Sequence, residues 1–149
     1  MNIDVRIMRS REALMAAYQR IAALLAFLYP DQELSPTRFE AFTASRDTLR
    51  VIGAYDGEVL VGMATLSFYA KLLGRVFIIE DVVVDPEYRG QGVGTRLVEA
   101  LIREARDLGA DYIDVSTRHP EAITLYEKLG FKKKDADRPF FALRLYLKA

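Results

Sequence analysis

Three glycines at alternate positions give one segment of the chain the residue types and spacing to hold a phosphate. In VVVDPEYRGQGVGT, residues 82–95, an apolar run leads into a loop with Gly90, Gly92 and Gly94, and then into a helical pattern. Glycine lets the backbone come close to a ligand and adopt dihedral angles that other residues avoid. The first turn of a helix presents unpaired N–H groups, and the helix dipole favours negative charge there. We therefore predict that backbone amides of this segment bind a pyrophosphate.

The spacing separates this loop from two other phosphate-binding motifs. A Walker A loop needs Gly-Lys-Ser/Thr, whereas Gly94 is followed by Thr95 without lysine. The dinucleotide fingerprint needs Gly-x-Gly-x-x-Gly after the first strand of a βαβ unit, and these glycines lie late in the chain. Arg89 and Arg96 would add positive charge at the rim of the loop. The alternative is a glycine-rich helix start that binds no ligand. The predicted contacts are Arg89, Gly90, Gln91, Gly92, Val93, Gly94 and Thr95.

Glu80 and Asp81 are the candidate acid–base residues, because they lie late in an otherwise apolar strand. Carboxylates in such a place are costly unless they are exposed, paired or functional. Because side chains alternate along a strand, we expect the two carboxylates on opposite faces, with Glu80 sharing a face with Val82 and Val84. Alternatively, one carboxylate caps a bulge or pairs with Arg75.

The composition fits one folded domain and excludes several classes of site. The chain has 149 residues, of which 51% are hydrophobic and 28% charged, and we expect a single domain over residues 1–149. There is no cysteine, which excludes disulfides and thiol nucleophiles and fits a cytoplasmic protein. His119 is the only histidine, so a zinc site with several imidazoles is excluded and no metal is expected. A serine triad would need this histidine, and the chain lacks the Gly-x-Ser-x-Gly setting.

Charge and hydropathy argue against nucleic-acid and membrane partners. Lys and Arg total 21, and Asp and Glu total 21, so the formal net charge lacks the basic excess typical of a nucleic-acid binder. The longest apolar stretch of the N-terminal half, residues 21–29, is too short to span a bilayer. The first residues have no basic region followed by an apolar run, so we expect no secretory signal.

The elements that must position these residues follow from the periodicity of the apolar side chains. The order is β-α-α-β-β-β-α-β-α-β-β, and it combines hairpins with a strand–helix–strand crossover. That combination implies a mixed sheet covered by helices on both sides. Strands are predicted at 2–8, 49–55, 58–69, 75–84, 112–116, 131–134 and 140–147, and helices between Ser10 and Pro30, from Pro36, at 91–108 and at 120–129.

Two segments in register resemble the GCN5-related N-acetyltransferase family. Its Arg/Gln-x-x-Gly-x-Gly/Ala signature is matched by Arg89, Gly92 and Gly94, and EAITLYEKLGF, residues 121–131, is similar to its helix–strand segment. The resemblance implies an α/β (α+β) fold with a mixed, mostly antiparallel sheet of about seven strands flanked by four helices. It also implies that acetyl-CoA is the co-substrate, and that a primary amine attacks its thioester directly, without an acyl-enzyme.

The resemblance further implies roles for individual residues. The strand edge at Val82, Val83 and Val84 would pair with the pantetheine arm, and the N–H of about Val82 would lie near the thioester oxygen. Tyr126 would protonate the departing sulfur, or else it only packs on the shoulder of a buried helix stripe. Glu80 would be the general base, directly or through water. His119 stands where many relatives have an asparagine that touches the CoA arm, so it would contact that arm. Alternatively, His119 only lies next to the helix N-cap, before Pro120.

The resemblance implies that the acceptor amine binds between the loop that joins the first two helices, the strand near Phe68 and the final hairpin. Tyr29, Phe68, Glu80 and Asp81 are the candidate substrate residues, because acids and aromatics together suit a cationic amine. Ordinary loop polarity over an aromatic core explains the same residues. Residues 79–94 also resemble hexosamine-phosphate acetyltransferases, although nothing outside that stretch secures a sugar-phosphate site.

Three functions stay open from the sequence. The first is an N-acetyltransferase for the primary amine of a small molecule, the second is a peptide or protein N-acetyltransferase, and the third is a CoA-binding module without catalysis. A homodimer formed by strand exchange in the final hairpin is a further open alternative.

Overall fold

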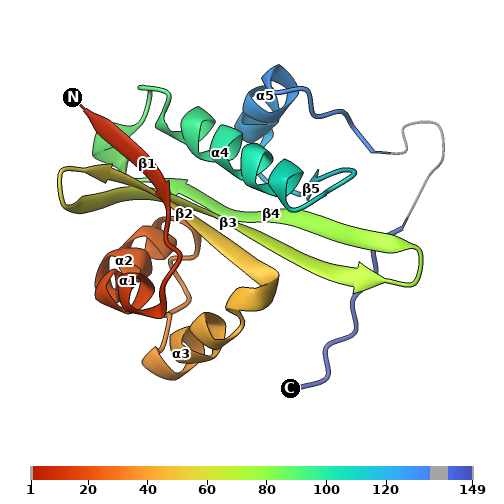
Figure 1. Ribbon diagram of the computed structural model, residues 1–149, viewed down its shortest axis with the longest axis horizontal. Coiled ribbons are helices and arrows are strands. Elements are labelled where there is room, and N and C mark those ends of the chain that lie inside the picture. Colours follow the sequence, from red (N-terminus) through yellow and green to blue (C-terminus); the bar gives the residue numbers. More distant parts are fainter. Residues whose placement is uncertain (1, 135–140, 149) are drawn as a thin grey trace. The chain divides into compact units, whose positions relative to one another are not determined.

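The computed structural model describes residues 2–134 and 141–148, in two compact units that meet in sequence between Ser116 and Thr117. The first unit contains a five-stranded sheet and most of the helices (Figure 1). The second unit contains helix α5 (Pro120–Lys128). The elements of the first unit are β1 (Ile3–Ile7), α1 (Arg11–Ala16), α2 (Tyr18–Leu28), α3 (Pro36–Ala44), the 3₁₀ turn η1 (Arg46–Thr48), β2 (Leu49–Asp56), β3 (Val59–Lys71), β4 (Gly74–Val84), the 3₁₀ turn η2 (Pro86–Tyr88), α4 (Val93–Asp107) and β5 (Asp114–Val115).

The sheet confirms the predicted mixed, mostly antiparallel arrangement. Its strands lie in the order β1-β2-β3-β4-β5; the pairs β1–β2, β2–β3 and β3–β4 are antiparallel, and β5 runs parallel to β4. Helices α1, α2 and α3 cover one face, and α4 covers the other (Figure 1). The crossover from β4 through α4 to β5 is what makes the last pair parallel.

Local capping signals place the N-terminal helices. The Ser10 hydroxyl accepts a hydrogen bond from the N–H of Ala13 at 3.0 Å, so it caps α1 as predicted. Ser35 caps α3 in the same way, with proline at the first helical position. The first predicted helix is divided in two at Ala17, whose N–H donates to the Leu14 carbonyl, three residues back. Such a 3₁₀-type bond tightens the chain and ends the first α-helical ladder.

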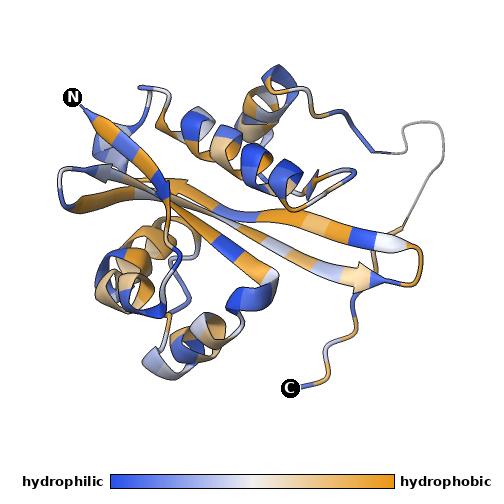
Figure 2. Cartoon of the chain, viewed as in Figure 1, coloured by the Kyte–Doolittle hydropathy of each residue, from blue (hydrophilic) through white to orange (hydrophobic). Residues whose placement is uncertain are grey.

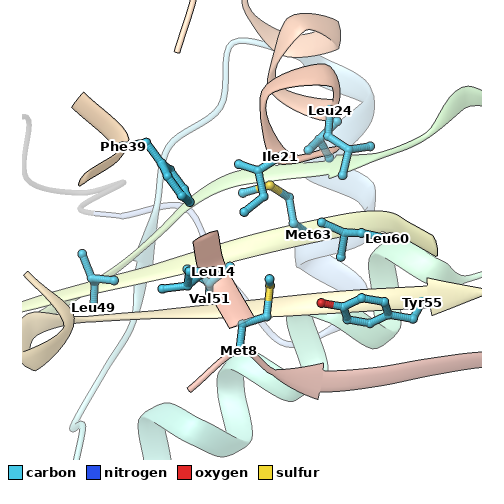
Figure 3. Packing of buried hydrophobic residues seen from close by; sticks show 11 residues of the cluster. Met8, Leu14, Ile21, Leu24, Phe39, Leu49, Val51, Tyr55, Leu60 and Met63 are labelled. Atoms are coloured by element: carbon cyan, nitrogen blue, oxygen red, sulfur yellow. The ribbon is translucent and has the colours of Figure 1, made fainter. Parts of the chain in front are cut away.

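The core on the α1–α3 face joins side chains that are far apart in the sequence. Leu14, Ile21, Leu24 and Phe39 from the helices pack against strand residues that include Met63 (Figure 3). All five side chains are at most 3% exposed. Their burial fixes α2 against the middle of the sheet, beside the end of β4.

Helix α4 covers the opposite face through one apolar stripe, and Figure 2 shows hydrophobic and hydrophilic residues alternating along it. Leu97 and Leu101 of this stripe are fully buried. Gly62 of β3 lies beneath it, because a Cβ built there would be 3.2 Å from a Leu97 methyl group. The missing side chain lets α4 lie close to the sheet, which sets the height of its N-terminus over the end of β4.

Leu97→Ala should lower the free energy of unfolding by about 3 kcal/mol, because it leaves a cavity between α4 and the sheet. Leu72→Ala is the matched control: Leu72 lies at the tip of the β3–β4 hairpin and is fully exposed, so a change below about 0.5 kcal/mol is expected. Urea unfolding measures both values. Equal losses in the two variants would contradict the packing described for α4.

The predicted final pair of strands is absent from the described residues. No strand is assigned at 131–134 or 141–148, so the described sheet has five strands rather than about seven, and residues 135–140 lie outside the description. Phe141, Leu143, Leu145 and Leu147 alternate as in a strand, yet each is more than four-fifths exposed. Alternation is a property of the segment alone, whereas a strand also needs a neighbour for its hydrogen bonds.

Candidate active site

The end of β4 presents an open backbone edge. β5 pairs with β4 only at Ile78 and Ile79, whereas β4 continues to Val84. Among the described residues no strand is assigned on that side of 80–84. An unpaired edge offers N–H and C=O groups to an extended ligand. The edge includes Val82, Val83 and Val84, the residues predicted to pair with the pantetheine arm.

A β-bulge at Asp81 changes which side chains share a face. In the register of β3 and β4, Thr65 lies opposite Glu80 and Met63 lies opposite Val83, so β4 carries one extra residue between these pairs. Asp81 has a φ of 53°, which makes it the only non-glycine residue with positive φ in the described part of the chain. Glu80 therefore shares its face with Val83. The prediction that it shares a face with Val82 and Val84 is wrong, because the bulge interrupts the alternation of side chains.

Glu80 bonds to Ser67 and Asp81 to Thr65, and these two residues share one face of β3. The prediction that the two carboxylates lie on opposite faces is therefore wrong; they lie close enough to affect each other's ionisation, and the tyrosine that ends α2 joins them. The Tyr29 hydroxyl donates a hydrogen bond to Asp81 Oδ1 at 3.2 Å. Burial raises the pKa of Glu80, the negative charge of Asp81 raises it further, and a hydrogen bond with Ser67 acts in the opposite sense. Burial also raises the pKa of Asp81, against hydrogen bonds with Tyr29 and Thr65. A carboxylate with a raised pKa is a better proton acceptor, which is what a general base needs.

Phe68 lies on the other face of the sheet. In the register of β3 and β4, Phe68 lies opposite Phe77, and Thr65 lies opposite Glu80. Phe68 is three residues along β3 from Thr65, and an odd spacing along a strand puts a side chain on the opposite face. The rings of Phe68 and Phe77 stack at 5.2 Å, and Phe68 is 8% exposed. The structure thus brings Tyr29 together with the two carboxylates but does not bring Phe68 to them.

The glycine loop has a geometry that fits a diphosphate. Gly90 and Gly92 have φ values of 76° and 79°, and Gly92 is the N-cap of α4. No side chain caps this helix start, so the amides that follow, from Val93 to Thr95, are not covered by a capping group. A Cβ built at Gly90 or Gly92 would meet nothing within 4 Å, so there is open space beside the loop. Uncapped amides, helix dipole and free space together suit an anionic ligand.

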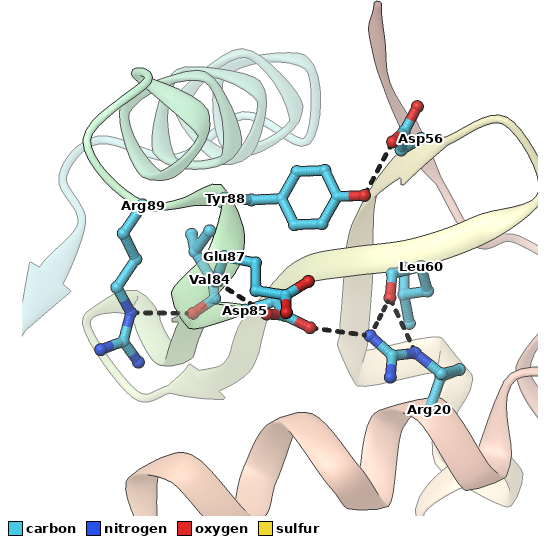
Figure 4. Close-up of polar contacts among 8 residues, drawn as sticks. All are labelled: Arg20, Asp56, Leu60, Val84, Asp85, Glu87, Tyr88 and Arg89. Atoms are coloured by element: carbon cyan, nitrogen blue, oxygen red, sulfur yellow. Dashed lines mark hydrogen bonds and ion pairs between the residues drawn. The ribbon is translucent and has the colours of Figure 1, made fainter. Parts of the chain in front are cut away.

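The two arginines of this region are held differently. Arg89 Nε donates to the Val84 carbonyl at 3.0 Å, which keeps its guanidinium beside the end of β4 (Figure 4). Arg96 Nη1 donates to the Ile3 carbonyl at 2.8 Å, so this guanidinium binds β1. Arg89 is thus available to the rim of the loop, while Arg96 stabilises the attachment of α4 to the sheet.

Sequence reasoning missed a set of residues behind the loop. In the segment that connects β4 with the glycines, Asp85 accepts a hydrogen bond from Arg20, and Tyr88 donates one to Asp56 (Figure 4). Only Asp85 has a local signal, because an aspartate before proline commonly caps a turn, and its Oδ1 does accept from the Glu87 N–H at 3.0 Å. The other contacts join residues 32 to 65 positions apart and leave no pattern along the chain.

The second unit holds the remaining predicted site residues. Tyr126 of α5 is 7% exposed, its ring meets the edge of Phe131 at 5.5 Å, and burial raises its pKa. The phenol therefore keeps its proton at neutral pH, as a general acid must. His119 is the N-cap residue of α5 without a side-chain capping bond, and its Nδ1 lies 3.6 Å from a Glu121 carboxylate oxygen.

Two further properties concern the described ranges as a whole. Within 2–134 and 141–148 no helix is long and apolar enough to cross a membrane. In the same ranges no three His, Asp or Glu side chains are grouped closely enough to hold a metal ion.

Comparison with known proteins identifies the family. The model of the acetyltransferase (GNAT) family matches residues 12–131. N-alpha-acetyltransferase RimI of Mycobacterium tuberculosis is 33% identical over 124 residues, which cover 83% of this chain and 77% of RimI. Thialysine N-epsilon-acetyltransferase of Sus scrofa is 33% identical over 81 residues, and the match spans 52% of this chain and about half, 48%, of that protein.

Solved structures agree with this match. The crystal structure of an acetyltransferase of Trypanosoma brucei superposes with a TM-score of 0.75 at 27% identity, covering 98% of this chain and all of the other. The family model extends over most of the sequence, including both segments that resemble the family signature. The chain therefore belongs to the acetyltransferase (GNAT) family and is an acetyl-CoA-dependent acyltransferase.

Proposed function

We propose that this protein transfers the acetyl group of acetyl-CoA to the primary amine of a small molecule by direct attack. The observation that carries the proposal is the geometry of one strand: the open edge of β4 runs from the carboxylate pair toward an uncapped glycine helix start. A ligand with an extended arm and a diphosphate would meet an unpaired strand edge and free amides in that order.

The coenzyme contacts follow from this order. The diphosphate would be bound by the amides of residues 91–95, with Arg89 at the rim, and the pantetheine arm would pair with Val82 to Val84. The N–H near Val82 would then donate to the thioester oxygen, where negative charge develops during attack. His119, whose imidazole is largely exposed, would be an additional contact to the arm.

In the transfer step the amine nitrogen forms a bond to the thioester carbonyl carbon, and the carbon–sulfur bond breaks. Glu80 accepts one proton from the bound ammonium group before the attack. The second proton leaves the nitrogen as the amide forms and replaces the proton that Tyr126 donates to the departing sulfur. The pKa values of both residues are raised in the direction that these roles need: the carboxyl becomes more basic, and the phenol remains protonated.

The acceptor would be bound by Tyr29, Glu80 and Asp81. Two carboxylates and a phenol favour a positively charged amine, because they offer hydrogen-bond acceptors and negative charge and no cationic group. Phe68 is stacked in the core of the other sheet face, so it would support the strand rather than touch the acceptor.

A peptide N-terminus is the second candidate acceptor. It is favoured by the similarity to RimI, an N-alpha-acetyltransferase by name, which covers more of this chain than the match to the thialysine enzyme. The same acidic pair would accept an N-terminal ammonium group. The two candidates differ in whether residues beyond the amine contribute to binding.

Thiol release from acetyl-CoA, measured across a panel of small diamines, amino sugars and N-terminal peptides, tests the proposal. A small amine should give the highest kcat/KM, and lengthening a peptide beyond two residues should not improve it. A steady gain in kcat/KM with peptide length would favour the second candidate. Tight CoA binding by calorimetry without turnover of any amine would contradict catalysis.

Glu80→Gln should lower kcat by about 100-fold, because it removes the proton acceptor while keeping the shape of the side chain. The wild-type rate should fall as the pH decreases through the raised pKa of Glu80, since the protonated carboxyl cannot accept a proton. The variant should lose this acidic limb. Asp81→Asn is the matched control: it should raise the KM for the amine and keep the limb. A limb that disappears in Asp81→Asn instead would assign the base to Asp81.

A further inference from the structure

The turn that leads from β4 into the glycine loop is anchored to two distant elements. η2 begins after Asp85, whose Oδ1 caps the turn and whose Oδ2 lies 3.3 Å from Nη2 of Arg20 on α2. At the other end of η2, the Tyr88 hydroxyl donates to Oδ2 of Asp56 at 2.7 Å. Figure 4 shows both anchors, the pair Asp85–Arg20 and the pair Tyr88–Asp56.

The first anchor is rigid because the guanidinium of Arg20 has a second partner. Its Nε and Nη2 donate to the Leu60 carbonyl at 3.0 and 2.9 Å. A planar guanidinium held by a fork of two hydrogen bonds has little freedom to leave Asp85. The Asp85 side chain is 18% exposed and the Arg20 side chain 42% exposed, so solvent screens this ion pair in part, and the two hydrogen bonds to Leu60 are what hold the guanidinium in place.

The second anchor comes from the β2–β3 hairpin. Asp56 is the last residue of β2, and its bond to Tyr88 fixes the residue directly before Arg89 and the first loop glycine. Since the hydrogen bond to the carboxylate raises the pKa of Tyr88, the hydroxyl remains a donor at neutral pH. The two anchors thus reach η2 from α2, through Arg20, and from the hairpin, through Asp56. Neither of these two residues belongs to the glycine loop.

We propose that Arg20 and Tyr88 are positioning residues for the coenzyme, which hold the glycine loop in the conformation that binds its diphosphate. The inference rests on the proposed role of that loop. Glycines leave a loop with many accessible conformations, so ordering it costs affinity unless neighbouring contacts order it beforehand. The anchors supply that order up to Tyr88, and the open space beside Gly90 and Gly92 leaves the amides free for the ligand.

Calorimetric titration with CoA on the full chain tests the inference. Arg20→Gln should weaken CoA binding by about tenfold, and Tyr88→Phe, which removes one oxygen atom, should weaken it by about threefold to tenfold. Arg20→Lys should recover part of the loss, because it keeps the charge beside Asp85 but lacks the fork on Leu60. Arg11→Gln is the matched control, since it removes a helix arginine from an exposed ion pair with Glu40 at 3.4 Å; its affinity should equal that of the wild type.

Steady-state kinetics separates positioning from a general loss of structure. The KM for acetyl-CoA should rise by the same factors, while kcat and the KM for the amine should stay within about twofold of the wild type. CoA affinities unchanged in both Arg20→Gln and Tyr88→Phe would overturn the inference. If Arg20→Gln does not fold, Tyr88→Phe decides alone. A wild-type chain that binds no CoA would overturn the proposed function, and the inference with it.

Discussion

Gly92→Ala is expected to weaken CoA binding by on the order of 100-fold. At a φ of 79° a Cβ strains the backbone, and relaxing that strain would turn the first amides of α4 away from the ligand. The same Cβ would also enter the open space that the diphosphate is proposed to fill. Hydrogen bonds between amides and a charged ligand are worth about 1.5–3 kcal/mol each, so the loss of one or two accounts for an effect of this size. Calorimetry with CoA measures it.

Gly109→Ala is the matched control for this substitution. Gly109 follows the other end of the same helix and has a φ of 85°, so alanine there carries a similar strain. Both variants should lose about 1 kcal/mol of stability in urea unfolding, and only Gly92→Ala should lose CoA affinity. Equal affinity in the two variants would show that the loop does not bind the diphosphate.

Tyr126→Phe should lower kcat by about 100-fold and leave the KM for acetyl-CoA within about twofold. The substitution removes the proton that the departing sulfur is proposed to receive. The ring and its edge contact with Phe131 remain, so the fold should be preserved. Because a phenol with a raised pKa donates its proton only below that pKa, the wild-type rate should not show a limb from this group until strongly alkaline pH.

Tyr112→Phe is the control for the loss of a hydroxyl group. Tyr112 is half-exposed and has no proposed role, so its kcat should equal that of the wild type. A kcat for Tyr126→Phe within twofold of the wild type, at an unchanged melting temperature, would leave Tyr126 as a packing residue. Acetyl-CoA analogues with better thiol leaving groups refine the test, because they should reduce the difference in kcat between Tyr126→Phe and the wild type.

Much of the fold follows from signals that lie within a few residues of one another. Ser10, Ser35 and Pro36 place two helix starts because a cap bonds to its own next turn. Asp56 and Gly57 give the hairpin turn, with Gly57 in the left-handed conformation that such turns require. The two predicted C-terminal strands are not assigned at 131–134 and 141–148, the part of that region that the structure describes, because alternation at 141–147 does not specify a neighbouring strand.

The features of the candidate site likewise divide into those that local sequence determines and those that depend on tertiary structure. The sequence by itself determined the family and the glycine-rich start of α4, because glycine spacing and a helix start act locally through backbone conformation and free amides. Only the tertiary structure decided the rest. The bulge at Asp81 put Glu80 on the face of Val83, the register put Phe68 on the other face, and Arg20 met Asp85 across 65 residues. These outcomes depend on strand register and on packing between distant elements, which the pattern along one segment does not encode.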